Sequence, residues 1–171
     1  MAEIEIKILE IDPNKIRRIL RLNKAKFIKK VLQKNIIYEN PYTKSKGLAV
    51  RIRREGKYTN FTVKSKVQFI KGHKIRREYE TEITDFKALE KILELIGLKR
   101  SSYAEAKREY WQLFGCSIEI MKMPKIPVFI EIEGAKKNIL KIVKLLGYSE
   151  KDYFIGYPPV HYKVDFKDLR F

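Results

Sequence analysis

The sequence has little of what several common classes of site require. Its 171 residues include one cysteine, Cys116, and two histidines, His73 and His161. A single cysteine excludes an internal disulfide and a cysteine-built zinc site, so we expect Cys116 to be a buried core residue. The histidines lack zinc-ligand spacing, and we expect a turn residue and a tail residue. No Ser/His/Asp or Cys/His set indicates covalent catalysis, and no glycine-rich loop indicates a P-loop.

Long apolar runs are also missing. No segment approaches the length of a membrane span, and Met1 leads directly into a charged strand rather than into a signal peptide. We therefore expect a soluble, cytoplasmic protein. No Gly/Ser-rich or Pro-rich linker divides the chain, so its length fits one domain over residues 1–171. A hydrophobic content of 44% is enough for a real core, although 35% of the residues are charged.

The charge balance is strongly basic. Lys and Arg number 38 against 21 Asp and Glu, which gives a formal net charge of +17. This excess predicts an anionic partner, and nucleic acid, an acidic membrane surface and polyphosphate all qualify on charge alone. A non-catalytic polyanion or RNA binder is therefore one hypothesis. We rank it third, because many basic residues alternate with carboxylates instead of following one uniformly basic helix.

Hydrophobic periodicity predicts an α+β fold. Asp12-Pro13 is typical of a helix start, Thr84 or Asp85 caps a second helix that Gly97 ends, and Asn40-Pro41 is typical of a turn. Each of three Glu-x-Glu strands precedes a helix, which indicates a pseudo-symmetric fold. Eight or nine strands are enough to close a barrel. The expected helices cover 12–23, 84–97 and 135–146, and the expected strands cover 3–9, 27–39, 48–54, 58–66, 74–83, 103–114, 116–122 and 128–133.

The polar faces of these strands carry mixed charges. Side chains two residues apart share a face, so Glu5 and Lys7 lie together, as do Arg51 and Arg53. A half-solvated sheet explains any single strand, but nearly every strand shows this pattern. If the sheet closes with its apolar faces outward against helices, these charges line a lumen that needs a counter-ligand. Arg and Lys would then hold phosphate oxygens, and Glu pairs would hold a hard cation such as Mg²⁺.

An ordered set of motifs resembles the CYTH, or triphosphate tunnel metalloenzyme, superfamily, which includes class IV adenylyl cyclases, thiamine triphosphatases and tripolyphosphatases. The N-terminal Glu3-Ile4-Glu5-Ile6-Lys7 resembles the family's Glu-x-Glu-x-Lys signature. The later matches are Gly47 to Arg53, Phe61 to Lys64, Arg76 to Glu82, Arg108 to Trp111 and Phe129 to Glu133. The resemblance implies a single CYTH-like domain over 1–171. It also implies an eight- or nine-stranded antiparallel β-barrel, the triphosphate tunnel, with helices packed outside.

The sequence departs from the family pattern at four places. Met121 stands where the family usually has an Asp, and Glu119 on the same strand face could replace it. Ala106 takes the place of a Lys, with Lys107 as its basic neighbour. The early Gln-x-Asp segment becomes Gln33-Lys34-Asn35. The C-terminal Ser-Tyr-x-x-Leu-Leu of the cyclase-like members matches poorly at residues 161–166.

The resemblance implies roles for individual residues. The triphosphate would be bound by Lys7, Arg51, Arg53, Lys64, Arg76 and Arg108, with Lys163 either a further ligand or a solvated tail lysine. One or two Mg²⁺ or Mn²⁺ ions would be held by Glu3, Glu5, Glu119, Glu131 and Glu133. The catalytic residues would be Glu5, Lys7 and Lys64. Alternatively, Arg76, Glu80 and Glu82 form an internal ion-pair network that orients the phosphate binders. We expect Glu78 at the surface.

Two reactions follow from the same site. If water attacks the terminal phosphorus, the enzyme is a metal-dependent triphosphatase acting on tripolyphosphate or on a nucleoside or thiamine triphosphate. If a ribose 3′-hydroxyl attacks the α-phosphorus of ATP, it is a cyclase that forms cyclic AMP and pyrophosphate. Fold and motif do not choose between them.

Overall fold

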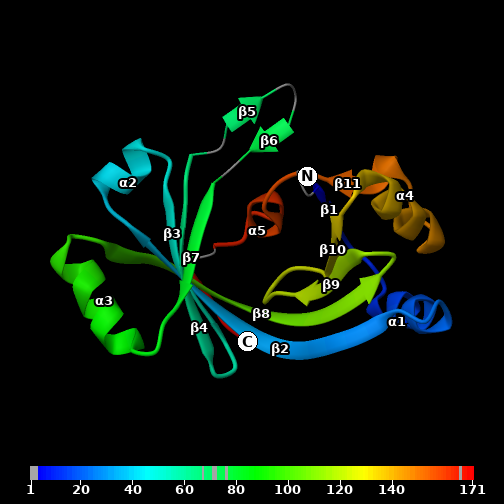
Figure 1. The fold of residues 1–171 in the computed structure, drawn as a ribbon, viewed down its shortest axis with the longest axis horizontal. Helices are drawn as coiled ribbons and strands as arrows, with labels where there is room; N and C mark the ends of the chain where they lie inside the picture. Colours follow the sequence, from blue (N-terminus) through cyan, green and yellow to red (C-terminus); the bar gives the residue numbers. More distant parts are fainter. Residues whose placement is uncertain (1–3, 67, 71–72, 76, 166) are drawn as a thin grey trace. The chain divides into compact units, whose positions relative to one another are not determined.

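The computed structural model describes residues 4–66, 68–70, 73–75, 77–165 and 167–171, and Figure 1 shows their helices and strands. The contacts divide the chain into two compact units. Unit 1 takes its described residues from Met1–Leu32, Ala106–Asp165 and Phe171, and unit 2 takes them from Gln33–Glu105 and Phe166–Arg170. Two long strands, β2 (Lys26–Glu39) and β8 (Lys99–Leu113), contribute to both units. The described helices and the extensive, mainly antiparallel sheet confirm the predicted α+β class.

Unit 1 combines the N-terminal strand and helix with the segment that begins at Ala106. Its strands follow the order β11-β1-β10-β9-β8, and each neighbouring pair is antiparallel. The elements are β1 (Ile4–Ile8), α1 (Pro13–Leu22), β9 (Cys116–Lys122), β10 (Phe129–Gly134), α4 (Lys136–Leu145), a 3₁₀ turn (Glu150–Asp152), β11 (Tyr153–Phe154) and α5 (Pro158–His161).

Unit 2 is built around a meander. Its strands follow the order β8-β2-β3-β4-β7, and short β12 pairs with β8 in parallel. The elements are α2 (Pro41–Ser45), β3 (Ala49–Glu55), β4 (Tyr58–Lys64), β5 (Gln68–Ile70), β6 (His73–Ile75), β7 (Glu78–Glu82), α3 (Phe86–Leu95) and β12 (Asp168–Leu169). Among the described strands, ten are joined in one hydrogen-bonded sheet and β5 pairs with β6 separately, against eight or nine strands predicted.

In each unit the apolar face of the strands packs against helices. In unit 1, Ile16 of α1 and Ile142 of α4 are fully buried in one cluster with the isoleucines of β1, β9 and β10. In unit 2, Leu93 of α3 joins a cluster with Ile36 and Ile52. Because strand side chains alternate, the ionic faces lie on the sides away from these helices. The predicted outward packing of apolar faces against helices is therefore observed within each unit.

Helix boundaries follow from capping side chains. The Asp12 carboxylate accepts hydrogen bonds from the backbone N–H groups of Asn14 and Lys15, and Pro13 opens α1 as predicted. Asp85 caps α3 through the N–H of Ala88, so Asp85 rather than Thr84 is the cap. Within the described residues, no helix is long and apolar enough to cross a membrane.

Three local predictions differ from the structure. Asn40-Pro41 is the start of α2 and not only a turn, because Asn40 and Thr43 form a reciprocal capping box. The strand predicted over 58–66 is the shorter β4, and the strand predicted over 74–83 contains the shorter β7. Just beyond the paired ends of β4 and β7, the backbone N–H of Ser65 still donates to the Arg77 carbonyl at 2.8 Å.

A charged residue on the helix-facing side of β8 ties α1 to the sheet. The Glu109 carboxylate accepts two hydrogen bonds from Arg17, at 2.8 and 2.9 Å, and Lys30 lies 3.2 Å away. Only 9% of the Glu109 side chain is exposed. The Arg17 hydrogen bonds hold the pKa of Glu109 below its ordinary value, and they outweigh burial, which would raise it.

Replacing Glu109 should therefore destabilise the protein in a pH-dependent way. A depressed carboxyl pKa stabilises the fold above the unfolded pKa of about 4.3, and this contribution is lost as pH falls through the folded pKa. We expect Glu109→Gln to lower the free energy of unfolding by about 1–2 kcal/mol at pH 7, and by much less near pH 3. Urea unfolding at both pH values measures this. Glu94→Gln, which breaks an exposed pair with Lys91, is the control and should change stability by less than about 0.5 kcal/mol. An equal loss at both pH values would contradict the assignment.

Candidate active site

The ionic face of unit 1 centres on Lys7. Its ammonium pairs with the Glu5 carboxylate on the same strand and with Glu131 of β10 at 3.5 Å. The antiparallel register places Lys7 opposite Glu131 and Glu5 opposite Glu133. Burial alone would lower the pKa of Lys7, but the charges of Glu131 and Glu5 outweigh it and raise the pKa. Lys7 therefore stays charged although only 16% of its side chain is exposed.

Arg108 is the second cation on this face. It donates to Glu119 of β9 at 2.6 Å, and 13% of its side chain is exposed. Burial opposes its charge, but the Glu119 and Glu131 carboxylates hold the pKa of Arg108 above its ordinary value. Its Nε–H is buried and has no hydrogen-bond partner among the described residues. A buried donor of this kind is costly unless an acceptor reaches it, and a phosphate oxygen would be such an acceptor.

The carboxylates of unit 1 supply the right donor chemistry for a hard divalent cation. Glu131 lies opposite Glu119 across β10 and β9, and Glu133 lies opposite Glu5. Carboxylate oxygens are the ligands that Mg²⁺ prefers. Within the described part of the chain, no group of three metal-ligating side chains is already assembled, and Glu3 lies outside the described residues. The donor set fits Mg²⁺ by type, and metal binding stays a prediction.

In unit 2 a network of acids and hydroxyls holds Arg51. Its guanidinium donates to the Thr62 hydroxyl at 3.2 Å and lies 3.7 Å from Glu80. Thr62 in turn donates to Glu80 at 2.7 Å. This hydrogen bond outweighs burial and, with the bond from Asn60 and the charge of Arg51, lowers the pKa of Glu80. Glu80 thus belongs to an ion-pair network with Arg51, whereas Arg76 lies outside the described residues.

Lys64 is held by the neighbouring carboxylate of β7. Its ammonium lies 2.6 Å from Glu78, which also lies 3.6 Å from Arg51. Glu78 is exposed, as predicted, yet it links the two cations. Glu82 is exposed and lies opposite Asn60 in the register.

Arg53 is held by the Asn35 amide, which the Gln33 amide orients in turn; the sequence marks both amides as the altered Gln-x-Asp segment but does not identify them as partners of Arg53. The Arg53 Nε–H donates to the side-chain oxygen Oδ1 of Asn35 at 3.2 Å, and the side-chain Nδ2 of Asn35 donates to Oε1 of Gln33 at 3.1 Å. Gln33 is fully buried. The available signal was the i, i+2 spacing of the two amides on β2, but their partner depends on the register that pairs Asn35 with Arg53.

Several remaining candidates lie apart from these clusters. Lys163 is exposed after α5 and makes no ion pair with any described residue. Met121, in the position of the expected Asp, is buried opposite Arg108 and Phe129. Lys107 is exposed, with its ammonium 4.0 Å from the centre of the Phe171 ring.

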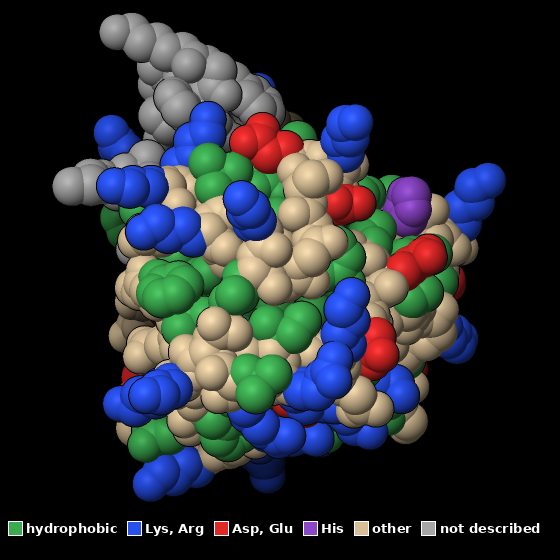
Figure 2. Space-filling view, turned by 90° about the vertical axis from the view of Figure 1, so that its right-hand side faces the viewer, with side chains coloured by type: hydrophobic (Ala, Val, Ile, Leu, Met, Phe, Trp, Pro, Cys, Tyr) green, Lys and Arg blue, Asp and Glu red, His purple; other side chains and the backbone are tan. Residues whose placement is uncertain are grey.

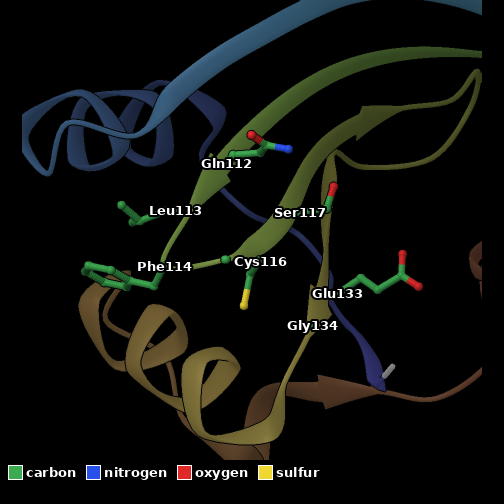
Figure 3. A pocket seen from close by; sticks show the side chains of 8 residues that line it. Gln112, Leu113, Phe114, Cys116, Ser117, Glu133 and Gly134 are labelled. Carbon is green, nitrogen blue, oxygen red and sulfur yellow. The ribbon is translucent and has the colours of Figure 1, made fainter. Parts of the chain in front are cut away.

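A pocket of about 440 Å³ opens at the turn between β8 and β9. Residues 112–117 line it together with Glu133 and Gly134, and Figure 3 shows the Glu133 carboxylate pointing away from the Cys116 thiol. Gly134 has a φ of +155°, and a Cβ there would lie 2.7 Å from the Cys116 sulfur. The buried Cys116 confirms the core prediction, and among the candidate site residues that the structure describes, Glu133 alone borders this pocket.

Comparisons with known proteins give consistent matches. The family model of the CYTH domain matches residues 1–154. The chain is 30% identical over 149 residues to a protein of Methanocaldococcus jannaschii named "Putative adenylate cyclase", covering 85% of this chain and 84% of that protein. A conserved hypothetical protein of Pyrococcus furiosus has a similar fold, with a TM-score of 0.74, 24% identity and coverage of 95% and 99%. An adenylyl cyclase homologue of Hippeastrum, described as having a dominant triphosphatase activity, matches with a TM-score of 0.59, 18% identity and coverage of 87% and 91%.

Proposed function

The chain belongs to the CYTH domain family, and we propose that it is a divalent-metal-dependent phosphohydrolase that acts on an inorganic or organic triphosphate. One observation carries the proposal. In both units, cations with largely buried side chains are held by carboxylates on strand faces that point away from the helix-packed core, as with Lys7 and Arg51. The triphosphatase activity attributed to the Hippeastrum protein supports the choice of reaction.

The cations would bind and orient the phosphates. Lys7 and Arg108 in unit 1, and Arg51, Arg53 and Lys64 in unit 2, would each donate to phosphate oxygens and offset their negative charge. Before substrate binds, paired carboxylates stabilise four of these cations, and the Asn35 amide oxygen holds Arg53. A phosphate group that reaches Lys7 would draw its ammonium from Glu5, and one that reaches Lys64 would draw its ammonium from Glu78. A cation held by Glu5, Glu119, Glu131 and Glu133, together with Glu3, would withdraw charge from the phosphate oxygens.

A second candidate is a cyclase, because the relative with 30% identity carries the name of an adenylate cyclase. The two reactions differ in the nucleophile and in the phosphorus attacked. Water at the terminal phosphorus releases orthophosphate, whereas the ribose 3′-hydroxyl at the α-phosphorus releases pyrophosphate and cyclic AMP. The cationic residues named above would serve either reaction.

A substrate panel separates the two. The protein is incubated with ATP, tripolyphosphate or thiamine triphosphate, each with Mg²⁺, with Mn²⁺ or with a chelator, and the products are resolved by chromatography. We expect orthophosphate only when a metal is present. Cyclic AMP with pyrophosphate would establish the cyclase instead. No turnover of any substrate with either metal would refute both reactions.

The hydrogen bonds from Arg53 to Asn35 and from Asn35 to Gln33 should raise the affinity of the Arg53 guanidinium for phosphate. Asn35→Leu removes the acceptor of the Arg53 Nε–H, and a hydrogen bond to a charged donor contributes about 1.5–3 kcal/mol. We expect the dissociation constant of tripolyphosphate, measured by calorimetry without metal, to rise about tenfold. In an Arg53→Ala background the same change should have almost no effect. Equal effects in both backgrounds would show that Asn35 does not act through Arg53.

A further inference from the structure

Helices α1 and α4 are uniformly basic. Together they carry eight Lys and Arg residues and no Asp or Glu. Their combined charge of +8 is nearly half of the net charge of +17. Acidic and basic residues alternate along the strands, which argues against a polyanion binder. They do not alternate along these two helices. We define the basic helix face as Lys15, Arg18, Arg21, Lys136, Lys137, Lys141 and Lys144.

The two helices share one side of unit 1. Both bury their apolar residues in the same cluster against the strands, with Leu20 of α1 and Ile139 of α4 as examples. Lys137, Lys141 and Lys144 follow the i, i+4, i+7 stripe on the opposite side of α4. A Cβ on Gly147, just after α4, would lie 3.8 Å from the Lys15 ammonium, so the end of α4 meets the start of α1. Figure 2 shows this side of the molecule, with many Lys and Arg side chains and fewer acidic ones.

The charges of the basic helix face are available to a partner. All seven side chains belong to exposed residues, and none makes an ion pair with a described residue. The eighth basic residue, Arg17, is engaged with Glu109 and is not part of the face. The nearest acidic residues in sequence are Asp12, which is occupied as the cap of α1, and Glu133, three positions before Lys136. Seven like charges on one side of a small unit repel one another, and a polyanion would relieve this repulsion.

The side chains of the face favour the phosphate backbone of a duplex over other polyanions. Neither helix itself contains an aromatic residue on which single-stranded bases could stack. Binding in an acidic membrane surface needs exposed large apolar side chains among the charges, and the two helices expose only Leu22. Duplex RNA is recognised partly through its 2′-hydroxyls, for which the helices offer only Asn14 and Asn138. Nonspecific binding of duplex DNA needs cations alone.

We propose that the basic helix face binds duplex DNA through its phosphates, independently of the triphosphate site. The test is fluorescence anisotropy with a labelled 20-base-pair duplex over a range of salt concentrations. Binding without sequence preference should occur with a dissociation constant of about 10 µM or tighter near ~0.1 M salt. The variant Lys137→Gln/Lys141→Gln/Lys144→Gln should reduce the slope of log affinity against log salt by about 2 to 3, since each phosphate contact contributes about 0.9.

A control variant with the same change in charge makes the test specific. Lys46→Gln/Lys87→Gln/Lys99→Gln removes three exposed lysines of unit 2, and it should change the slope by less than about 1. Equal losses in both triple variants would attribute binding to net charge and overturn the proposal. So would the absence of duplex binding by the unmodified protein, or tighter binding of single strands, duplex RNA or vesicles rich in anionic lipid. Turnover of triphosphate by the α4 variant should be unchanged.

Discussion

Glu5→Gln should lower the turnover of triphosphate by about a thousandfold, while the free energy of unfolding stays within about 1 kcal/mol of the unmodified protein. The two effects separate because of where Glu5 lies. About half of its side chain is exposed, at 47%, so loss of its charge does not leave a buried group unpaired. Lys7, its partner, keeps Glu131 at 3.5 Å. The carboxylate that the proposed function assigns to metal binding and catalysis is lost, with little change in packing.

The measurement combines steady-state kinetics with urea unfolding of the same preparation. Glu150→Gln is the matched control, since Glu150 is an exposed carboxylate outside the candidate site, in the turn before β11. It should change neither quantity. Full activity of Glu5→Gln would remove Glu5 from the catalytic group. A large loss of stability would show that Glu5 supports the fold and that its effect on turnover is indirect.

The elements that the sequence predicts well are those whose signals are local. Alternating isoleucine and charge identify β1, β9 and β10, because a strand with one face in the core needs that period. A capping carboxylate locates the start of α1 and of α3 to within a residue. The short C-terminal elements are not predicted, because they lack such local signals. Short α5 contains Pro158-Pro159, and β11 and β12 are two residues each, too short for any periodicity.

The contacts of the candidate site depend on register and are harder to predict. Alternation places Arg51 and Arg53 on one face, but only the pairing of β3 with its neighbours shows that acids hold Arg51 and that an amide holds Arg53. Glu109 has the sequence signature of a surface residue. It is nevertheless buried, and its carboxylate is paired with Arg17, which lies 92 positions away in the chain. Sequence reasoning finds which residues are ionic, and the strand pairing determines what each contacts.

Arg108→Leu should have the largest effect on stability, a loss of about 3–5 kcal/mol in the free energy of unfolding, because it leaves a buried carboxylate without its cation. Glu119 keeps only 16% of its side chain exposed, and it accepts a hydrogen bond from Arg108 at 2.6 Å. Arg170→Leu is the matched control. Its guanidinium lies 2.7 Å from Asp168, but both side chains are about 60% exposed, so we expect no measurable loss of stability.

A double variant separates the structural role of Arg108 from its role in binding. Arg108→Leu/Glu119→Leu removes both charges of the pair, and replacing a buried ion pair by apolar groups is often close to neutral. We therefore expect it to recover most of the lost stability in urea unfolding. Its affinity for tripolyphosphate, measured by calorimetry without metal, should stay as low as that of Arg108→Leu, because the phosphate-binding guanidinium is still missing. If affinity returned with stability, Arg108 would be a structural residue, and the assignment of phosphate binding to this side chain would fail.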